Sequence, residues 1–348
     1  MNYIGSKASL VPFLEQSIVK VVGSQTGSFC DLFAGTGAVG RRFKELGHTV
    51  LANDALYYAY VLNRHYIGNS KALKFNGLKI GGKVKERPVM VVEELNSLEG
   101  CEGFIYQNYS WSGTQLLEVP RRYFSDENAA RCDAIRLQIE SWFVEKLITP
   151  DEYFFLLTTL LESIDKYANT ASVYGAFLKG LKKIAQKTLV LKPAALILSS
   201  KQNRVYNQDA NGLVEQLSGD VLYLDPPYNH RQYSSNYHIL ETIARNDNPE
   251  IRGITGLRMG GESNYSLRTK VLQSFTELIS KANFRYIFLS YNNEGLLGFD
   301  EIRTVMSQKG KYGCFEIDYP RFKADRDSNR SFAHTKTTEY LHYVVVGK

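Results

Sequence analysis

The order of apolar and polar positions along the chain predicts an α/β fold. Residues 28–33 form a short apolar run, and 38–46 carries apolar residues at helical spacing up to Gly47. A second apolar run at 48–52 follows at once and ends at Asn53-Asp54. A strand, a helix and a strand in this order indicate a βαβ unit, and therefore a parallel sheet.

The same alternation returns in the last part of the chain. It predicts strands at 220–224, 284–290 and 339–346, and an amphipathic helix at 267–281. These elements extend the α/β core begun by the first residues. We therefore expect one core made of 1–70 and 186–348.

Residues 71–185 interrupt the alternation. A lysine- and glycine-rich stretch at 71–87 predicts short strands or loop, and longer helical patterns follow at 126–143, with Ser125 as N-cap, and at 153–164. This block is expected to be a largely helical insertion between the two parts of the core.

Composition narrows the class of protein. The chain has 348 residues, of which 44% are hydrophobic and 22% charged, which argues against disorder, collagen-like repeats and coiled coil. No apolar run is long enough for a membrane span, and the N-terminus does not resemble a secretory signal. Cysteines at 30, 101, 132 and 314 are too scattered for a zinc site or a disulfide framework, so we expect free thiols in an intracellular protein.

A glycine-rich motif lies between the first strand and the first helix. Phe33-Ala-Gly35-Thr-Gly37-Ala-Val-Gly40 has the spacing of a nucleotide-binding turn, and Asp54 follows nineteen residues after Gly35. Glycines let the backbone approach a ligand, the helix N-terminus offers unpaired N–H groups, and an acid after the second strand can accept hydrogen bonds from ribose. A glycine turn without a ligand is the alternative, and the motif alone does not separate NAD from S-adenosylmethionine.

The segment Asp225-Pro226-Pro227-Tyr228 follows the strand at 220–224. The exocyclic amine of a base is a poor nucleophile because its lone pair is delocalised into the ring. A carboxylate from Asp225 and a carbonyl from Pro226 can accept its hydrogens, and the prolines hold that carbonyl in place. Tyr228 offers an aromatic face for a base. The segment thus indicates transfer of a group to the amine of a base. A nicotinamide dehydrogenase would have no use for this segment.

With these motifs, the chain resembles the DNA adenine-N6 methyltransferases of the Dam-like (alpha-order, D12) class, and among them the restriction–modification methylases. The resemblance implies a Rossmann-like core that uses S-adenosylmethionine, needs no metal and methylates a flipped adenine in double-stranded DNA. The late segments 290–292 and 338–341 follow motifs that help wall the base pocket. The resemblance also implies cofactor-binding roles for Tyr3, Lys7, Asp31, Phe33, Gly35, Gly37, Asp54 and Asp209.

The charge pattern points to one stretch for DNA contact. The formal net charge is +6, and residues 166–208 hold eight basic side chains and no acidic one. Lys179, Lys182 and Lys183 are candidates there, and a solvated helix face is the alternative reading. Three weaker candidates are Arg231, Arg321 and Lys323. The two tryptophans, Trp111 and Trp142, are expected to serve packing.

Three other functions share this fold: methylation of cytosine N4 in DNA, methylation of adenine in RNA, and a DNA-binding regulator that holds cofactor without catalysis. Aspartate as the first residue of the catalytic motif favours adenine over cytosine. We expect a cytoplasmic monomer, with a restriction endonuclease as a functional rather than a physical partner.

Overall fold

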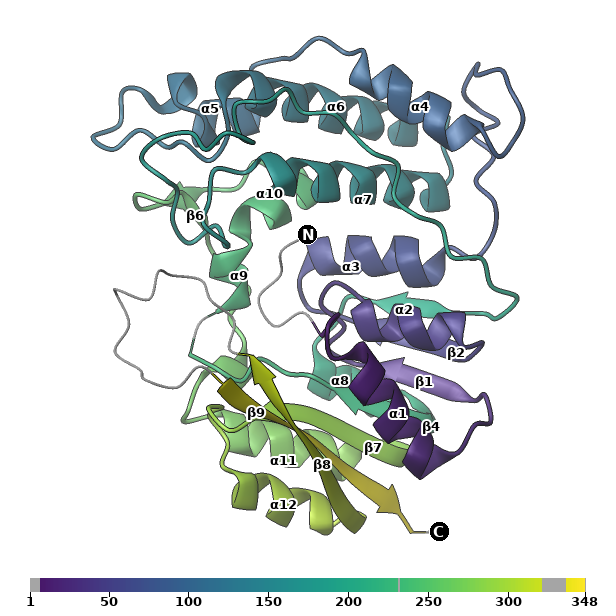
Figure 1. Cartoon of the computed structure of the whole chain (residues 1–348). Coiled ribbons are helices and arrows are strands. Elements are labelled where there is room, and N and C mark those ends of the chain that lie inside the picture. The colour runs from purple at the N-terminus through teal and green to yellow at the C-terminus, as the bar shows by residue number, and fades with distance from the viewer. Residues whose placement is uncertain (1–6, 231, 321–335, 348) are drawn as a thin grey trace. The chain divides into compact units, whose positions relative to one another are not determined.

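The computed structural model describes residues 7–230, 232–320 and 336–347, which form two compact units (Figure 1). The sheet unit takes its described residues from 4–63, 199–233 and 261–348. The helical unit comprises 64–198 and 234–260.

A seven-stranded sheet forms the sheet unit, with the order β3-β2-β1-β4-β7-β9-β8. The first five strands in this order pair in parallel, and β9 pairs antiparallel with β7 and with β8. The predicted parallel core is confirmed, and a hairpin extends it at one edge. The strands are β1 (Ser28–Asp31), β2 (Thr49–Asn53), β3 (Arg204–Tyr206), β4 (Ser218–Leu224), β7 (Asn283–Asn292), β8 (Gly310–Pro320) and β9 (Lys336–Val346).

Helices cover both faces of this sheet, because successive side chains of a strand point to opposite sides. Phe29 of β1 stacks on Phe43 of α2, with ring centroids 3.8 Å apart. The next residue, Cys30, belongs to the apolar cluster formed with α8, α11 and α12. The helices of the sheet unit are α1 (Val11–Val22), α2 (Ala38–Glu45), α3 (Tyr57–Asn63), α8 (Ala210–Val214), α11 (Val271–Lys281) and α12 (Phe299–Ser307), with a 3₁₀ turn at Asn264–Ser266.

The helical unit is built on two long antiparallel helices, α6 (Asp126–Val144) and α7 (Pro150–Tyr167). Ser125 caps α6 as predicted, because its side chain accepts a hydrogen bond from the Asn128 N–H. The other elements are a π-helical turn at Arg64–Gly68, α4 (Arg87–Asn96), α5 (Phe104–Tyr109), a 3₁₀ turn at Ser112–Thr114, α9 (Tyr233–Asn236), α10 (His238–Arg245), β5 (Ile251–Arg252) and β6 (Leu257–Arg258).

Two segments of the helical unit bear on the predicted insertion. Residues 71–86 and 168–198 contain neither helix nor strand, so the basic stretch after α7 is irregular chain rather than a helix face. Residues 234–260, which the apolar pattern grouped with the core, pack here instead. Arg136 of α6 donates hydrogen bonds to the carbonyls of Ile243 and Ala244 in α10.

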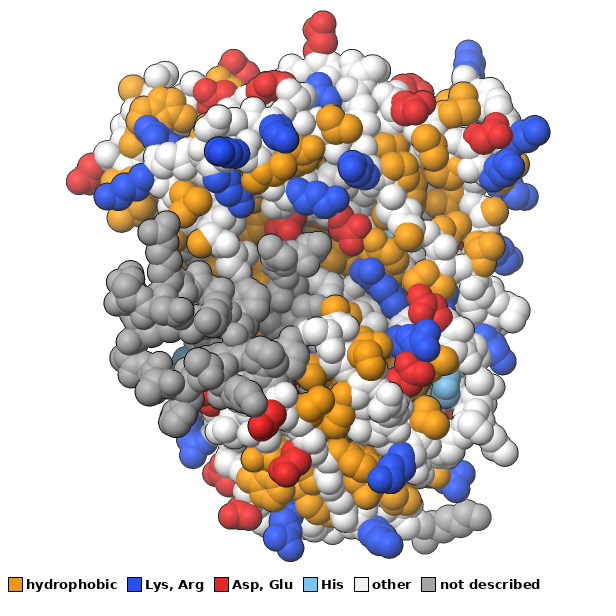
Figure 2. Space-filling model, in the orientation of Figure 1, with side chains coloured by type: hydrophobic (Ala, Val, Ile, Leu, Met, Phe, Trp, Pro, Cys, Tyr) orange, Lys and Arg blue, Asp and Glu red, His pale blue; other side chains and the backbone are white. Residues whose placement is uncertain are grey.

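The surface charges and the cysteines do not change this description of the fold. On the face in Figure 2, basic side chains are interspersed with acidic and apolar ones over both units, so the positive excess is not one patch on that face. All four cysteines are free, and Cys30 and Cys132 are buried. Across the described residues, no helix combines the length and the apolar character that a bilayer crossing requires.

Candidate active site

The carboxyl ends of β1 and β4 bring the two predicted motifs together. The strands are adjacent and parallel, with Asp31 opposite Tyr223, so the glycine turn and Asp225 leave the same edge of the sheet. The strand order reverses at this point, since β2 and β3 continue on one side and β7 on the other. Ligands of open α/β sheets bind at such a reversal.

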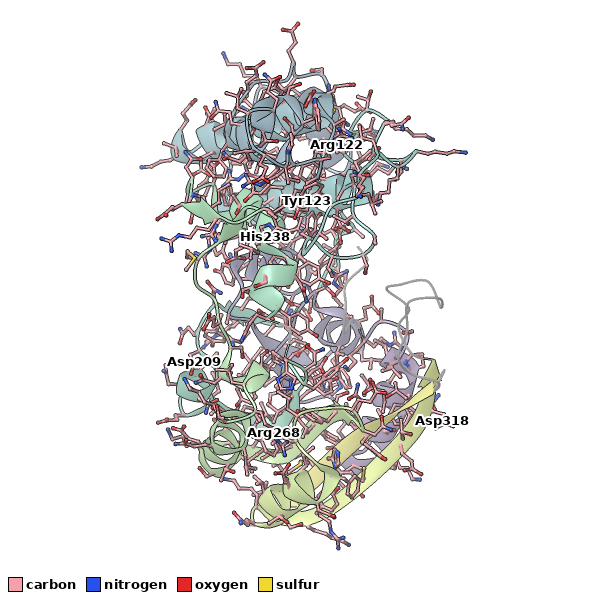
Figure 3. The ribbon with its side chains drawn as sticks, turned by 90° about the vertical axis from the view of Figure 1, so that its left-hand side faces the viewer. Arg122, Tyr123, Asp209, His238, Arg268 and Asp318 are labelled. Carbon is pink, nitrogen blue, oxygen red and sulfur yellow. The ribbon has the colours of Figure 1, made fainter. Side chains whose placement is uncertain are left out.

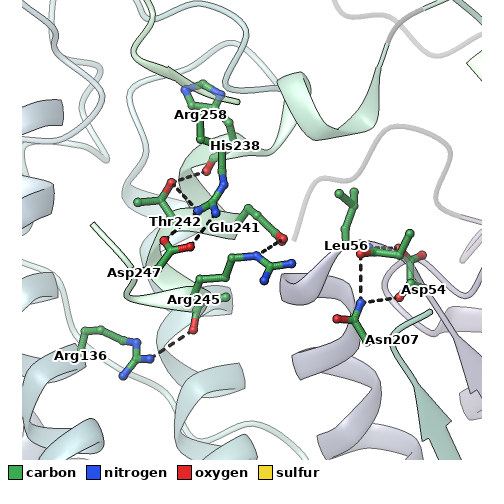
Figure 4. A network of polar contacts seen from close by, with 12 residues as sticks. Asp54, Leu56, Arg136, Asn207, His238, Glu241, Thr242, Arg245, Asp247 and Arg258 are labelled. Atoms are coloured by element: carbon green, nitrogen blue, oxygen red, sulfur yellow. Dashed lines mark hydrogen bonds and ion pairs between the residues drawn. The ribbon is translucent and has the colours of Figure 1, made fainter. Parts of the chain in front are cut away.

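Neighbouring side chains hold the glycine turn in shape. Gly35 and Gly37 have φ values of 51° and 77°, which side chains disfavour. The Gly35 N–H donates to Asp54 Oδ2 at 2.8 Å, and Asn63 Nδ2 donates to the Gly35 carbonyl at 2.9 Å. Asp54 Oδ1 accepts the Leu56 N–H (Figure 4). Asp54 therefore fixes the turn itself, and a ligand would use the remaining lone pairs of its carboxylate.

Asp225 forms an ion pair with Lys7. The Lys7 ammonium lies 3.0 Å from Asp225 Oδ1 and 5.1 Å from the centroid of the Tyr228 ring. The side chain of Lys7 is 4% exposed and that of Asp225 is 15% exposed. Burial by itself lowers the pKa of Lys7, but Asp225, Tyr228 and Glu339 outweigh it and hold that pKa well above its ordinary value. Burial raises the pKa of Asp225, and Lys7 opposes this rise.

Glu339, which belongs to the late segment 338–341, is a second carboxylate beside Lys7. It lies on β9 opposite Asn292 of β7 and is 5% exposed. Its Oε2 is buried and has no hydrogen-bond partner among the described residues. Burial raises the pKa of Glu339, with Lys7 opposing and Asp225 adding to the rise.

Aromatic residues lie beside both motifs. Tyr228 meets Tyr291 of β7 edge to face, with ring centroids 5.9 Å apart, and its carbonyl accepts the Leu296 N–H. Phe33 of the glycine turn meets Tyr265 edge to face at 5.0 Å. Flat rings at these positions can pack against a base or against the adenine of a cofactor.

The last predicted acid of the cofactor site, Asp209, is exposed at the start of α8 (Figure 3). Its side chain accepts the Gly212 N–H and caps the helix. Tyr265 was not indicated by the sequence motifs. Burial raises the pKa of Tyr265, and the charge of Asp209 adds to this rise. Its hydroxyl donates a hydrogen bond to Asn211 of the same helix. The aromatic ring of Tyr265 is therefore tied to the helix that Asp209 begins.

Comparison with known proteins identifies the family of this chain. The family model of the D12 class N6 adenine-specific DNA methyltransferases matches residues 3–305. The chain belongs to this family. The methyltransferase is 50% identical to the "Type II methyltransferase M.NlaIII" of Neisseria lactamica over 345 residues, which cover 98% of both chains.

Two further relatives are longer proteins. The chain is 40% identical to the "Type II methyltransferase M.FokI" of Planomicrobium okeanokoites, and this match covers 99% of the chain and 52% of the relative. It is 37% identical to the "Modification methylase LlaI" of Lactococcus lactis subsp. lactis, and this match covers 95% of the chain and 52% of the relative. The methyltransferase thus spans about half the length of these two relatives and nearly all of M.NlaIII.

Family membership confirms the predicted methyltransferase core and implies S-adenosylmethionine as the methyl donor. The residues present fit such a group. Asp31 Oδ2 accepts the Gly40 N–H at 3.1 Å, whereas its Oδ1 is buried and has no hydrogen-bond partner among the described residues. A buried carboxylate oxygen beside a glycine turn suits the cationic methionine end of this cofactor. The described residues contain no cluster of three or more His, Cys, Asp or Glu side chains arranged to hold a metal ion.

Asp31 makes a testable contribution to stability. Burial, with Asp225 adding and the Gly40 hydrogen bond opposing, raises the pKa of Asp31 to about 8. The unfolded carboxyl titrates near ~3.9. Between these values the folded chain holds a proton that the unfolded chain has lost, so this contribution to stability is present at low pH and falls as the pH rises towards about 8.

We expect the free energy of unfolding of Asp31→Asn to fall less steeply with pH than that of the wild type. The measurement is the free energy of urea unfolding of the cofactor-free protein in steps from about pH 5 to about pH 8, the window that the raised pKa defines. Wild-type and variant curves of equal slope would contradict the assignment of this titration to Asp31.

The remaining predicted residues fall into two groups. Tyr3, Arg231, Arg321 and Lys323 lie outside the described residues. Lys179, Lys182 and Lys183 belong to the helical unit. Lys179 and Lys183 are exposed, whereas Lys182 is half-buried and donates to the Thr170 carbonyl at 3.0 Å.

The two tryptophans differ in burial. Trp142 is buried, as expected of a packing residue. Trp111 is 42% exposed and packs against the guanidinium of Arg122, which lies 3.7 Å from the ring centroid.

Proposed function

We propose that this chain is the modification enzyme of a type II restriction–modification system, and that it methylates N6 of a flipped adenine within a specific duplex site. The names of M.NlaIII and M.FokI as type II methyltransferases support the type. One observation carries the assignment of the reaction to particular residues. It is the position of Asp225, which is half-buried at the end of β4, the strand next to β1 and its glycine turn.

Asp225 and Pro226 would act on the amine. Lys7 occupies Asp225 Oδ1 and so orients the carboxylate, which leaves Oδ2 to accept a hydrogen from N6. The carbonyl of Pro226, held by two successive prolines, would accept the second hydrogen. Both contacts draw the nitrogen lone pair out of the ring and towards the methyl group. Tyr228, backed by Tyr291, would stack on the flipped base.

The same carboxylate can also take up the proton that the methylated amine must lose. Burial raises the pKa of Asp225, which makes it a better proton acceptor than an exposed aspartate. S-adenosylmethionine, when bound, supplies a methyl group already activated by its sulfonium, so no metal is needed to polarise it. The chain's own contribution is then position and orientation.

The glycine turn would hold the cofactor. Asp31, Gly35 and Gly37 would bind its methionine end, and Asp54 its ribose. Phe33 and Asp209 would lie at its adenine, with Tyr265 as a further wall. By the family resemblance, Lys7 and Tyr3 would also lie close to the cofactor. In the structure, Lys7 forms an ion pair with Asp225.

Transfer of labelled methyl groups tests this function directly. Purified protein incubated with labelled S-adenosylmethionine and unmethylated duplex DNA is expected to label the DNA, and digestion to nucleosides should yield N6-methyl-2′-deoxyadenosine. N4-methyl-2′-deoxycytidine as the product, or RNA as the better substrate, would overturn the adenine-in-DNA assignment. Cofactor and DNA binding without transfer would indicate a regulator instead.

The helical unit, which includes the insertion 71–185, is proposed to bind the target DNA. Phosphate contacts make DNA affinity depend on salt, with a slope of about −0.9 per contact in a logarithmic plot. We expect the double change Lys179→Gln and Lys183→Gln to lower this slope by about 2 in magnitude. Lys182→Gln should change it less, because Lys182 is half-buried and hydrogen-bonded to Thr170.

Titration of a fluorescent duplex at several salt concentrations measures these slopes. Lys311→Gln, at an exposed position on β8 of the sheet unit, is the matched control and should leave the slope unchanged. A slope equal to that of the wild type in the double variant would mean that these lysines are ordinary solvated side chains.

We further propose that the enzyme acts as a monomer in the cytoplasm, where its DNA substrate lies. A cognate endonuclease would share the recognition site without binding the enzyme. Sequencing of DNA from a host that expresses the chain, with methylated positions mapped, would define that site.

A further inference from the structure

A short hairpin of the helical unit has an unusually constrained turn. Strands β5 and β6 pair Ile251 with Arg258 and Arg252 with Leu257, and residues 253–256 connect them. Each of the four turn carbonyls lies within hydrogen-bonding distance of a buried side chain. These contacts are Gly253 to Arg121 Nη2 (3.0 Å), Ile254 to Arg121 Nε (3.0 Å), Thr255 to His238 Nε2 (3.1 Å) and Gly256 to the Tyr109 hydroxyl (2.9 Å).

The three side chains that hold the turn form one packed group. Tyr109 ends α5, His238 begins α10, and Arg121 lies between α5 and α6; all are at most 7% exposed. The His238 ring lies edge-on to the rings of Tyr109 and Tyr123, with centroids about 6 Å apart. Tyr123 and His238 are labelled in Figure 3. At its other end, the hairpin is tied to Asp247 by both terminal nitrogens of Arg258 (Figure 4).

Arg121 also gives the turn a distinctive charge. Its guanidinium donates to the carbonyls of Gly253, Ile254 and Asn108, and it forms no ion pair with a carboxylate among the described residues. Burial of a cation without a counter-charge is costly, and it lowers the pKa of Arg121. The carbonyls of Gly253 and Ile254 point inward to this cation, and both residues are exposed, so this part of the turn faces solvent with an uncompensated positive charge behind it.

The outer side of the turn presents an apolar side chain. Ile254 is 63% exposed although its backbone is fixed. The loop that leads into Arg121 is similarly apolar and exposed at its tip, where Leu116 is 97% exposed. Thr114 anchors this loop, since its hydroxyl accepts the Arg121 N–H at 2.8 Å. Two exposed apolar tips thus depend on the same buried arginine.

We propose that the turn 253–256 is a preformed DNA-contact element that places Ile254 against base edges in the major groove of the target duplex. This inference rests on the proposed function, and it assigns recognition to a segment outside 71–185. A two-stranded ribbon fits the major groove, and an apolar side chain there contacts thymine methyl groups. The positive charge of Arg121 favours a polyanionic partner over an apolar protein surface.

Ile254→Ala tests the contact without touching the fold, because the side chain is mostly exposed. We expect KM for DNA to rise about tenfold, with kcat at saturating DNA unchanged, since a lost base contact weakens binding by roughly this factor or more. Affinity for S-adenosylmethionine and the unfolding temperature should also stay unchanged. Val144→Ala, at an equally exposed apolar residue that ends α6, is the matched control and should behave as wild type.

Tyr109→Phe tests the preorganisation. It removes the hydroxyl that donates to Gly256 and keeps the ring. Tyr109 is a positioning residue in this proposal, so the variant should raise KM for DNA without lowering kcat, and amide exchange at 253–256 should accelerate. A variant that exchanges faster but keeps the KM of the wild type would overturn the link between turn and DNA.

Equilibrium binding of a fluorescent duplex separates this proposal from the proposed function. If wild-type protein binds duplex DNA but transfers no methyl group, the proposed function fails, and weaker binding by Ile254→Ala would still support the DNA contact. If wild-type protein methylates DNA and Ile254→Ala matches it in both KM and affinity, the DNA contact alone is overturned.

Discussion

Asp225→Asn is expected to lower kcat for DNA methylation by about 100- to 10,000-fold, the usual contribution of a positioned acid–base group. The amide keeps the shape of the carboxylate but cannot take the proton that N6 loses, and its NH₂ group repels an amine donor. Binding of S-adenosylmethionine should remain, because the glycine turn is held by Asp54 and Asn63 rather than by Asp225.

Single-turnover transfer of labelled methyl groups measures this effect, with cofactor affinity determined in parallel. Asp300→Asn, at an exposed position in the first turn of α12, is the matched control and should retain activity. Activity of Asp225→Asn within about tenfold of the wild type would exclude a central role for the carboxylate in the reaction.

Lys7→Met is expected to lower the free energy of unfolding by about 3–5 kcal/mol, the usual cost of removing one partner from a buried ion pair. Asp225 and Glu339 would then lie buried without the cation that both now face. The free energy of urea unfolding at neutral pH is the measurement. The double variant Lys7→Met, Asp225→Asn should regain much of the lost stability while remaining inactive.

In the Lys7→Met variant, we expect activity to rise with pH and stability to fall with pH. Lys7 opposes the rise in the pKa of Asp225, so its removal raises that pKa further. The reaction needs the ionised carboxylate, and the residual activity of Lys7→Met should therefore increase with pH. Stability should decrease over the same range, because a carboxyl whose pKa is raised by folding holds its proton better in the folded chain. A Lys7→Met variant as stable as the wild type would show that this pair is not buried in solution.

Much of the sheet unit was predictable because its signals are local. Glycine allows the positive φ that a tight turn needs and a proline pair fixes φ, whatever surrounds them, so the turn at Gly35–Gly37 and the segment after β4 could be located directly. Apolar runs located β1, β2, β4, β7 and β9 for the same reason. The three-residue strand β3 and the hairpin β5–β6 were missed, since so short a strand carries no alternation. The longer edge strand β8 was also not predicted.

By itself, then, the sequence determined the reaction class, the order of the core elements and the two motifs at the carboxyl edge of the sheet. Only the tertiary structure decided which charges meet: Lys7 with Asp225 and Glu339, and Arg121 with the turn 253–256 rather than with a carboxylate. These residues are far apart in the chain, and burial and pairing depend on the folded surroundings of a side chain. Sequence spacing carries no record of those surroundings.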